Sequence, residues 1–169
     1  MSLIPCFRCV AGGLVAMCML SSTASAEPLI SKTYGYFSIG GKTAEALDRE
    51  LERRGPVTNA TGHRHPGATE IKFGGEVTYL ERGKECSVGN VKVTLKTNLI
   101  LPRWKNRRTA DKNLRFIWDT LSADIKRHEE RHAEIARTYA RTLERDLHAL
   151  RSASSCPELE KKVGAVTKR

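Results

Sequence analysis

The stretch that decides the fold runs from residue 111 to residue 150 and reads DKNLRFIWDTLSADIKRHEERHAEIARTYARTLERDLHAL. It contains neither proline nor glycine, and residues with high helix propensity dominate it. At 100° per residue, one set of apolar side chains falls within about 40° of Leu114 on a helical wheel. These are Trp118, Leu121, Ile125, Tyr139, Leu143 and Leu150. The pattern predicts one long amphipathic helix whose apolar stripe packs against the rest of the chain.

The centre of this stretch carries the motif H-E-x-x-H, as His128-Glu129-Glu130-Arg131-His132. Histidines four residues apart project from one helix face and can share a zinc ion, and the adjacent glutamate can then activate a metal-bound water. On the wheel, His128 and His132 fall within the apolar stripe and Glu129 lies about 60° from Leu114. We therefore expect both histidines on the inward face as zinc ligands, with Glu129 as the general base.

Two other interpretations of this helix lack a metal. A salt-bridged surface helix explains the many Arg and Glu residues, but not two imidazoles in successive turns of the apolar stripe. Alternatively, the two histidines are buried and structural, with hydrogen bonds to the backbone.

A catalytic zinc site also needs a third protein ligand and an open position for water. The extended motif that would supply a third histidine from the same helix is absent, because Thr138 occupies its place. The preferred candidate is His65, because Pro66 and Gly67 follow it and lead into a strand expected to pack on the long helix. The neighbouring His63 is the second candidate, and an exposed loop without any role is the alternative for both.

Glu158 and Glu160, near the C-terminus, are further candidates for the third ligand. The helical rise from His132 to Leu150 is about 27 Å, which argues against them if the long helix is unbroken.

The remaining chain predicts strands and two short helices. Alternating apolar residues indicate strands, Thr43 can cap a helix, and Gly74-Gly75 indicates a bulge or a tight turn. The expected strands cover residues 33–39, 69–80 and 88–101, and the expected short helices cover 43–54 and a segment opening at Cys156. We expect an α+β fold of the zincin-like kind, with a small antiparallel sheet of three or four strands packed on the long helix.

The N-terminus has the pattern of a signal peptide. Arg8 precedes an apolar run over residues 9–20, and Ala24-Ser25-Ala26 offers a small-x-small cleavage site. The run is too short for a membrane-spanning helix, which needs about 20 apolar residues. The sequence thus predicts cleavage near Ala26, one domain over residues 27–169, and a periplasmic or secreted location.

Two cysteines remain after that cleavage, Cys86 and Cys156. In an oxidising compartment a single remaining pair predicts one disulfide. A metal site made of their two thiolates is the competing interpretation, and the absence of a Cys-x-x-Cys pair argues against it.

The composition is that of a soluble globular protein, with 40% hydrophobic and 28% charged residues and a formal net charge of +10. Six basic residues gather between Arg103 and Arg115. No DNA- or RNA-binding motif accompanies them, so we expect no nucleic-acid partner. Outside the cytoplasm, anionic envelope polymers and acidic proteins are the partners that such a charge favours.

Four segments together resemble a bacterial family of predicted secreted zinc-dependent proteases that is catalogued as a domain of unknown function. They are residues 34–43 (YGYFSIGGKT), 62–69 (GHRHPGAT), 101–104 (LPRW) and 128–137 (HEERHAEIAR). The resemblance covers nearly the whole chain after the signal peptide, including both remaining cysteines. It implies an exported zincin-like protein with His128 and His132 as ligands and Glu129 as catalytic base.

The sequence therefore predicts a secreted zinc-dependent hydrolase, specifically a metallopeptidase that acts on a peptide or protein substrate with zinc as its cofactor. The alternative is a non-catalytic, basic, envelope-binding protein with a degenerate or structural metal site.

Overall fold

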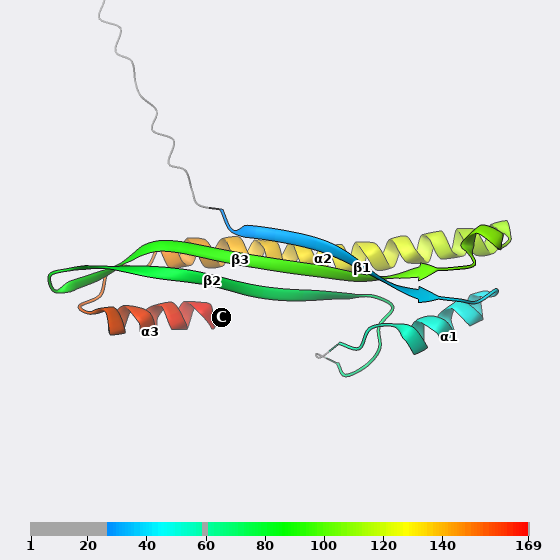
Figure 1. Cartoon of the computed structure of the whole chain (residues 1–169), viewed down its shortest axis with the longest axis horizontal. Helices are drawn as coiled ribbons and strands as arrows, with labels where there is room; N and C mark the ends of the chain where they lie inside the picture. Colours follow the sequence, from blue (N-terminus) through cyan, green and yellow to red (C-terminus); the bar gives the residue numbers. More distant parts are fainter. Residues whose placement is uncertain (1–26, 59–60, 169) are drawn as a thin grey trace, which may run out of the picture.

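The computed structural model describes residues 27–58 and 61–168. The predicted signal peptide lies outside the described residues. The molecule is elongated, and its longest helix runs beside a narrow sheet along the long axis (Figure 1). The α+β class is confirmed.

Three strands form one sheet in the order β1-β3-β2. β2 (Ala68–Arg82) and β3 (Glu85–Trp104) are an antiparallel hairpin, which turns at Gly83 with a φ of 61°. β1 (Leu29–Ile39) pairs with β3 in parallel. The prediction of an antiparallel sheet was therefore wrong, and the sheet is mixed. The chain passes through a helix and then β2 between β1 and β3, and this long connection lets β3 return in the direction of β1.

The prediction of a bulge or a tight turn at Gly74-Gly75 was also wrong, because β2 runs through both glycines without a register shift. The shift lies further on, between Val77 and Tyr79. Gly75 is explained by the close approach of β3, since a Cβ there would lie 2.3 Å from the carbonyl oxygen of Lys92.

The first helix, α1 (Ala44–Arg54), begins and ends as its sequence predicts. The Thr43 side chain accepts a hydrogen bond from the Ala46 N–H at 3.2 Å, and Gly55 follows the last turn. Its buried residues close one end of the sheet in a cluster with the first turns of the long helix. The cluster consists of Ile39, Leu47, Leu51, Trp104, Leu114 and Trp118.

Glu50 of α1 should respond to pH in a predictable way. Hydrogen bonds from Arg53 and from the Gly40 N–H lower the pKa of its carboxyl from 4.5 to about 2. Because the folded pKa is the lower one, these contacts stabilise the fold fully above pH 4.5, and their contribution is lost as the pH falls toward 2. A carboxyl-carbon NMR titration should place the Glu50 midpoint near pH 2, and Arg53→Gln should raise it. A midpoint above pH 4 in the unsubstituted protein would contradict this expectation.

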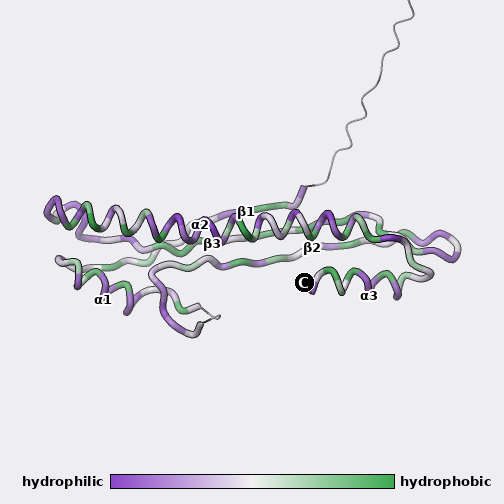
Figure 2. The backbone as a smooth tube through the Cα atoms, turned by 180° about the vertical axis from the view of Figure 1, so that it is seen from behind, coloured by the Kyte–Doolittle hydropathy of each residue, from purple (hydrophilic) through white to green (hydrophobic). Residues whose placement is uncertain are grey.

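The long helix, α2 (Lys112–His148), covers one face of the sheet. Asp111 caps it, because its carboxylate accepts hydrogen bonds from the N–H groups of Asn113 and Leu114 at 2.9 Å. Alternate residues of β3 are buried toward α2, from Val91 to Leu101. Figure 2 shows apolar and polar positions alternating along α2, as an amphipathic helix requires.

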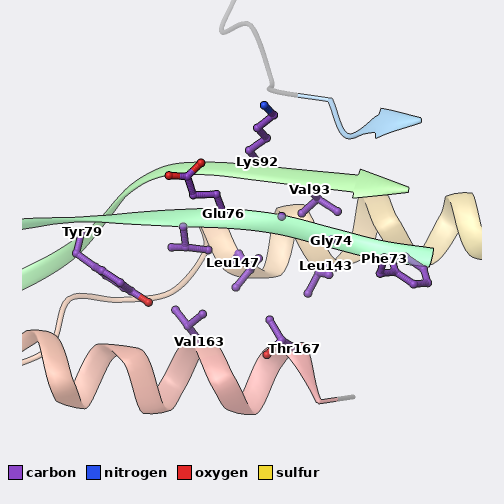
Figure 3. Close-up of a pocket in the computed structure, with 12 residues that line it drawn as sticks. Phe73, Gly74, Glu76, Tyr79, Lys92, Val93, Leu143, Leu147, Val163 and Thr167 are labelled. Atoms are coloured by element: carbon purple, nitrogen blue, oxygen red, sulfur yellow. The ribbon is translucent and has the colours of Figure 1, made fainter. Parts of the chain in front are cut away.

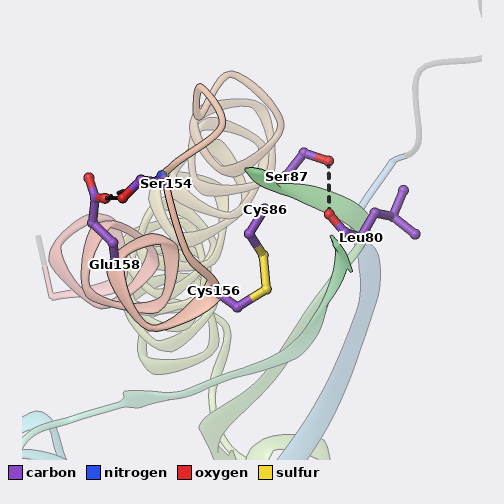
Figure 4. Close-up of a disulfide and its surroundings, with 6 residues drawn as sticks. All are labelled: Leu80, Cys86, Ser87, Ser154, Cys156 and Glu158. Atoms are coloured by element: carbon purple, nitrogen blue, oxygen red, sulfur yellow. Dashed lines mark hydrogen bonds between the residues drawn. A yellow bond between two sulfur atoms is a disulfide. The ribbon is translucent and has the colours of Figure 1, made fainter. Parts of the chain in front are cut away.

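A disulfide attaches the last helix, α3 (Cys156–Thr167), to the hairpin end of the sheet. Cys86 at the start of β3 is fully buried and is bonded to Cys156, as the cysteine count predicts (Figure 4). Cys86 also exchanges two backbone hydrogen bonds of 2.9 Å with Ala153. The end of α2, the connection to α3 and the hairpin are thereby held together.

Candidate active site

The structure corrects the predicted orientation of the H-E-x-x-H motif. His128 and His132 are exposed, whereas Glu129 is buried, with 6% of its surface accessible. The buried stripe of α2 passes through Glu129, about 60° round the wheel from Leu114. The two histidines therefore lie beside the buried face and open to solvent, and the glutamate between them points toward the sheet. The interpretation of the histidines as buried structural residues was wrong.

The physical reason is the size of the residues that contact β3. The buried stripe consists largely of alanines in this part of the helix, at Ala133, Ala136 and Ala140. Small side chains let the helix approach the sheet closely. A wheel weighted by large apolar residues centres near Leu114 and gives full weight to Tyr139, which is 64% exposed.

The two histidine rings lie one helical turn apart, edge to face, with 77° between their planes. The Nε2 atom of His132 lies 3.1 Å from the Nε2 atom of His128, and the ring centroids are 4.8 Å apart. A tetrahedral zinc with Zn–N distances of about 2.05 Å separates two nitrogen ligands by about 3.3 Å. The observed spacing is close to that value, so the pair has the geometry of two ligands to one ion.

Glu129 is held by the start of β2. The Thr69 hydroxyl lies 2.7 Å from the Glu129 carboxylate oxygen Oε2 and 3.0 Å from its backbone carbonyl oxygen. Gly67 lies against the other carboxylate oxygen, because a Cβ at this position would come within 3.1 Å of Oε1 and 2.7 Å of the Ile125 side chain. Gly67 therefore leaves room beside Oε1, and Thr69 fixes Oε2.

The motif itself does not predict Thr69 and Gly67, which lie about 60 residues before Glu129. The signal in the sequence was indirect. The segment 65–69 (HPGAT) precedes a strand, and that strand was expected to pack on the long helix. The contacts with Glu129 show that it does.

The loop histidines His63 and His65 make contacts within their own loop. The Nε2 atom of half-buried His65 lies 2.7 Å from the Thr61 hydroxyl oxygen, and the His65 N–H donates to the Pro56 carbonyl at 3.0 Å. His63 is exposed, and its N–H donates to the Thr61 hydroxyl oxygen at 3.2 Å. One residue, Pro66, separates His65 from Gly67, so the two Cα atoms are at most about 7 Å apart.

The two glutamates of α3 lie at the disulfide-linked end of the molecule. The Glu158 carboxylate accepts a hydrogen bond from the Ser154 hydroxyl at 2.7 Å (Figure 4), and this bond, followed by Lys162, lowers its pKa. Glu160 is exposed on the same helix. Over residues 27–58 and 61–168, no three His, Cys, Asp or Glu side chains form a group that could hold a metal ion. The third ligand stays a prediction.

Two hollows flank β2. One has a volume of about 400 Å³ and is apolar, between the middle of β2, the C-terminal half of α2 and α3 (Figure 3); Phe73, Leu143, Leu147 and Val163 are among its lining residues. The other, of about 480 Å³, lies between residues 56–58 and 68–72, next to the strand segment that contacts Glu129.

Most of the chain matches a bacterial protein family. Residues 34–169 match the family described as "Bacterial protein of unknown function (DUF922)", and the chain belongs to it. No curated protein and no solved structure matches the chain. Within the described part of the chain, no helix is both long enough and apolar enough to cross a membrane.

Proposed function

We propose that this protein is an exported zinc-dependent hydrolase of the zincin-like kind, specifically a metallopeptidase. The observation that carries the proposal is the 3.1 Å separation between the Nε2 atoms of His128 and His132, on an exposed face next to the buried Glu129. Two imidazoles held at chelating distance beside a carboxylate are the core of a catalytic zinc site. The Cys86–Cys156 disulfide supports a periplasmic or secreted location.

His128 and His132 can supply two of the three protein ligands that such a site needs. Neutral imidazole nitrogen is a ligand that zinc prefers, and both rings are open to solvent. We propose His65 as the third ligand, because the chain from His65 to Gly67 is short and Gly67 lies against Glu129. This role requires His65 to exchange its contact with the Thr61 hydroxyl for the metal.

Glu129 is suited to hold and move a proton. Zinc bound by the histidines would supply a Lewis acid and lower the pKa of a water molecule there. With Oε2 fixed by the Thr69 hydroxyl, Oε1 is the atom of Glu129 that accepts the proton of the attacking water. Burial and the Thr69 contact hold this carboxylate in one orientation, which favours proton transfer at a defined atom.

A peptide is the substrate that the surroundings of the site favour. β2 is an edge strand, so the backbone groups on its outer side have no partner strand within the described sheet. An extended peptide can add to such an edge by main-chain hydrogen bonds. The hollow of about 480 Å³ beside residues 68–72 gives that peptide space next to Thr69.

The second candidate is a basic envelope-binding protein with a degenerate or structural metal site. It is favoured by one observation, the lack of a third ligand grouped with the two histidines over the described residues. The two candidates respond oppositely to two reagents. Binding to an anionic polymer should weaken with salt and ignore chelators, whereas zinc-dependent hydrolysis should stop with chelators and depend little on salt.

Zinc stoichiometry tests the metal site directly. The purified protein should bind one zinc per chain, measured by elemental analysis after dialysis, and both His128→Ala and His132→Ala should lose it. His148→Ala is the matched control, because this exposed histidine lies on the same helix away from the motif and its replacement should leave zinc binding unchanged. We expect His65→Ala to weaken zinc binding as well. Equal zinc content in all four variants would exclude the proposed site.

A further inference from the structure

The end of the molecule where α2 begins exposes two large apolar side chains. Phe116 is 73% exposed and Ile117 is 47% exposed, although Leu114 and Trp118 on the same two turns are buried. Phe116 has the largest exposed fraction of any large apolar residue in the described part of the chain. Packing within the protein does not account for this pair.

Positive charge surrounds the same two turns. Residues 103–120 contain six cations and two carboxylates, a net charge of +4. Both carboxylates are already engaged, because Asp111 caps α2 and Asp119 pairs with Arg107 at 2.6 Å. Lys105, Arg108 and Lys112 are exposed, and none of them has an ion-pair partner within 4.0 Å among the described residues.

These groups lie at one end of the molecule. Lys112 and Phe116 are four residues apart on α2, so they lie on the same side of the helix. Lys105 and Arg108 lie in the segment just before α2, which contains the short 3-10 helix η1 (Arg107–Thr109), at the same end of the molecule (Figure 1). We call Lys105, Arg108, Lys112, Phe116 and Ile117 the basic end.

We propose that the basic end docks the protein on an anionic lipid surface. Cations next to exposed aromatic and aliphatic side chains are the composition of protein surfaces that lie in the bilayer interface. A soluble polyanion would be bound by the cations alone and would give Phe116 and Ile117 no role. His128 lies 12 residues beyond Phe116, about 18 Å along the helix, so the basic end and the candidate active site are separate regions of α2.

Vesicle co-sedimentation of the protein, purified as the expressing cells produce it, tests the proposal. Vesicles of phosphatidylcholine containing phosphatidylglycerol should bind the protein, pure phosphatidylcholine vesicles should bind it far more weakly, and added salt should release it. Phe116→Ser with Ile117→Ser should weaken binding about 10- to 100-fold, and Lys112→Gln about fivefold.

Matched substitutions on the same helix serve as controls. Ile135 is also 47% exposed and Arg141 is exposed, and both lie away from the basic end. Ile135→Ser and Arg141→Gln should leave vesicle binding unchanged. All variants share one N-terminus, so the differences between them report on the substituted residues only.

Fluorescence distinguishes insertion from simple charge attraction. The chain has two tryptophans, Trp104 and Trp118, and both are buried. Phe116→Trp adds an exposed one, which brominated lipid chains should quench only in anionic vesicles. The proposal is overturned if this tryptophan is not quenched, or if the Phe116 and Ile117 variant binds vesicles as tightly as the controls. It is also overturned if the protein binds polyglutamate but not vesicles, and the binding to polyglutamate does not depend on these two residues.

Discussion

Replacing Glu129 by glutamine is expected to lower kcat/KM for peptide hydrolysis by about 10²- to 10⁴-fold, the usual effect of losing a general base. Glutamine keeps the size of the side chain and its contact with Thr69, but it cannot accept the proton at Oε1. Zinc content should be unchanged, because Glu129 is not proposed as a ligand. The measurement is cleavage of a mixed-sequence fluorogenic peptide library, with zinc determined on the same samples.

The neighbouring glutamate provides the matched control. Glu130 is half-buried, and its carboxylate accepts a hydrogen bond from the Tyr34 hydroxyl of β1 at 2.9 Å. Glu130→Gln should leave activity within about twofold of the unsubstituted protein, because the contacts of Glu130 are with Tyr34, Lys32 and Lys126 and not with the histidines or Glu129. Peptide cleavage that survives Glu129→Gln, or that falls equally in both variants, would contradict the proposed role of Glu129.

A substitution at Thr69 tests whether the orientation of the Glu129 carboxylate matters for catalysis. Thr69→Val removes the hydroxyl that fixes Oε2 and leaves the carboxylate in place. We expect a partial loss of kcat with little change in KM, because the base is present but less well oriented. A normal kcat in this variant would show that the Thr69 contact has no part in catalysis.

Removal of the disulfide should produce the largest change in stability. The bond joins residues 70 apart, and the loop-entropy relation gives about 4 kcal/mol for such a loop. Changing both Cys86 and Cys156 to serine should therefore lower the free energy of unfolding by about 2–5 kcal/mol. Urea denaturation followed by circular dichroism measures it.

A reductant provides the control for the serine variant. It should destabilise the unsubstituted protein to about the level of the variant and leave the variant itself unchanged. A loss below about 1 kcal/mol in both cases would mean that packing of α3 on β3 and α2, rather than the covalent link, holds the last helix.

The local elements of the fold could be read from the sequence because their signals are local. The Thr43 cap, the stretch without Pro or Gly from 111 to 150, and the count of cysteines predicted α1, α2 and the disulfide. The direction of β1 could not be read in this way. It depends on the path of residues 40–67 in space, and no residue within β1 indicates that path.

In the candidate site too, the features set by local sequence could be predicted, and those set by distant segments could not. The spacing of His128 and His132 places them one turn apart in any helix, and the structure has them in contact. Which face they occupy depends on where β3 packs, and the alanine stripe that decides this has little weight on a hydrophobic wheel. The contacts of Glu129 with Gly67 and Thr69 join segments that no local pattern connects.

The mixed sheet has a consequence for the order in which the protein folds. The hairpin brings Arg82 opposite Glu85, whereas β1 must pair Leu29 with Thr94 across 65 residues. Closing a long loop costs more chain entropy than closing a short one, and such pairings form slowly. We expect the hairpin to form early and β1 to join late, so that during folding β3 is transiently an edge strand open to intermolecular pairing.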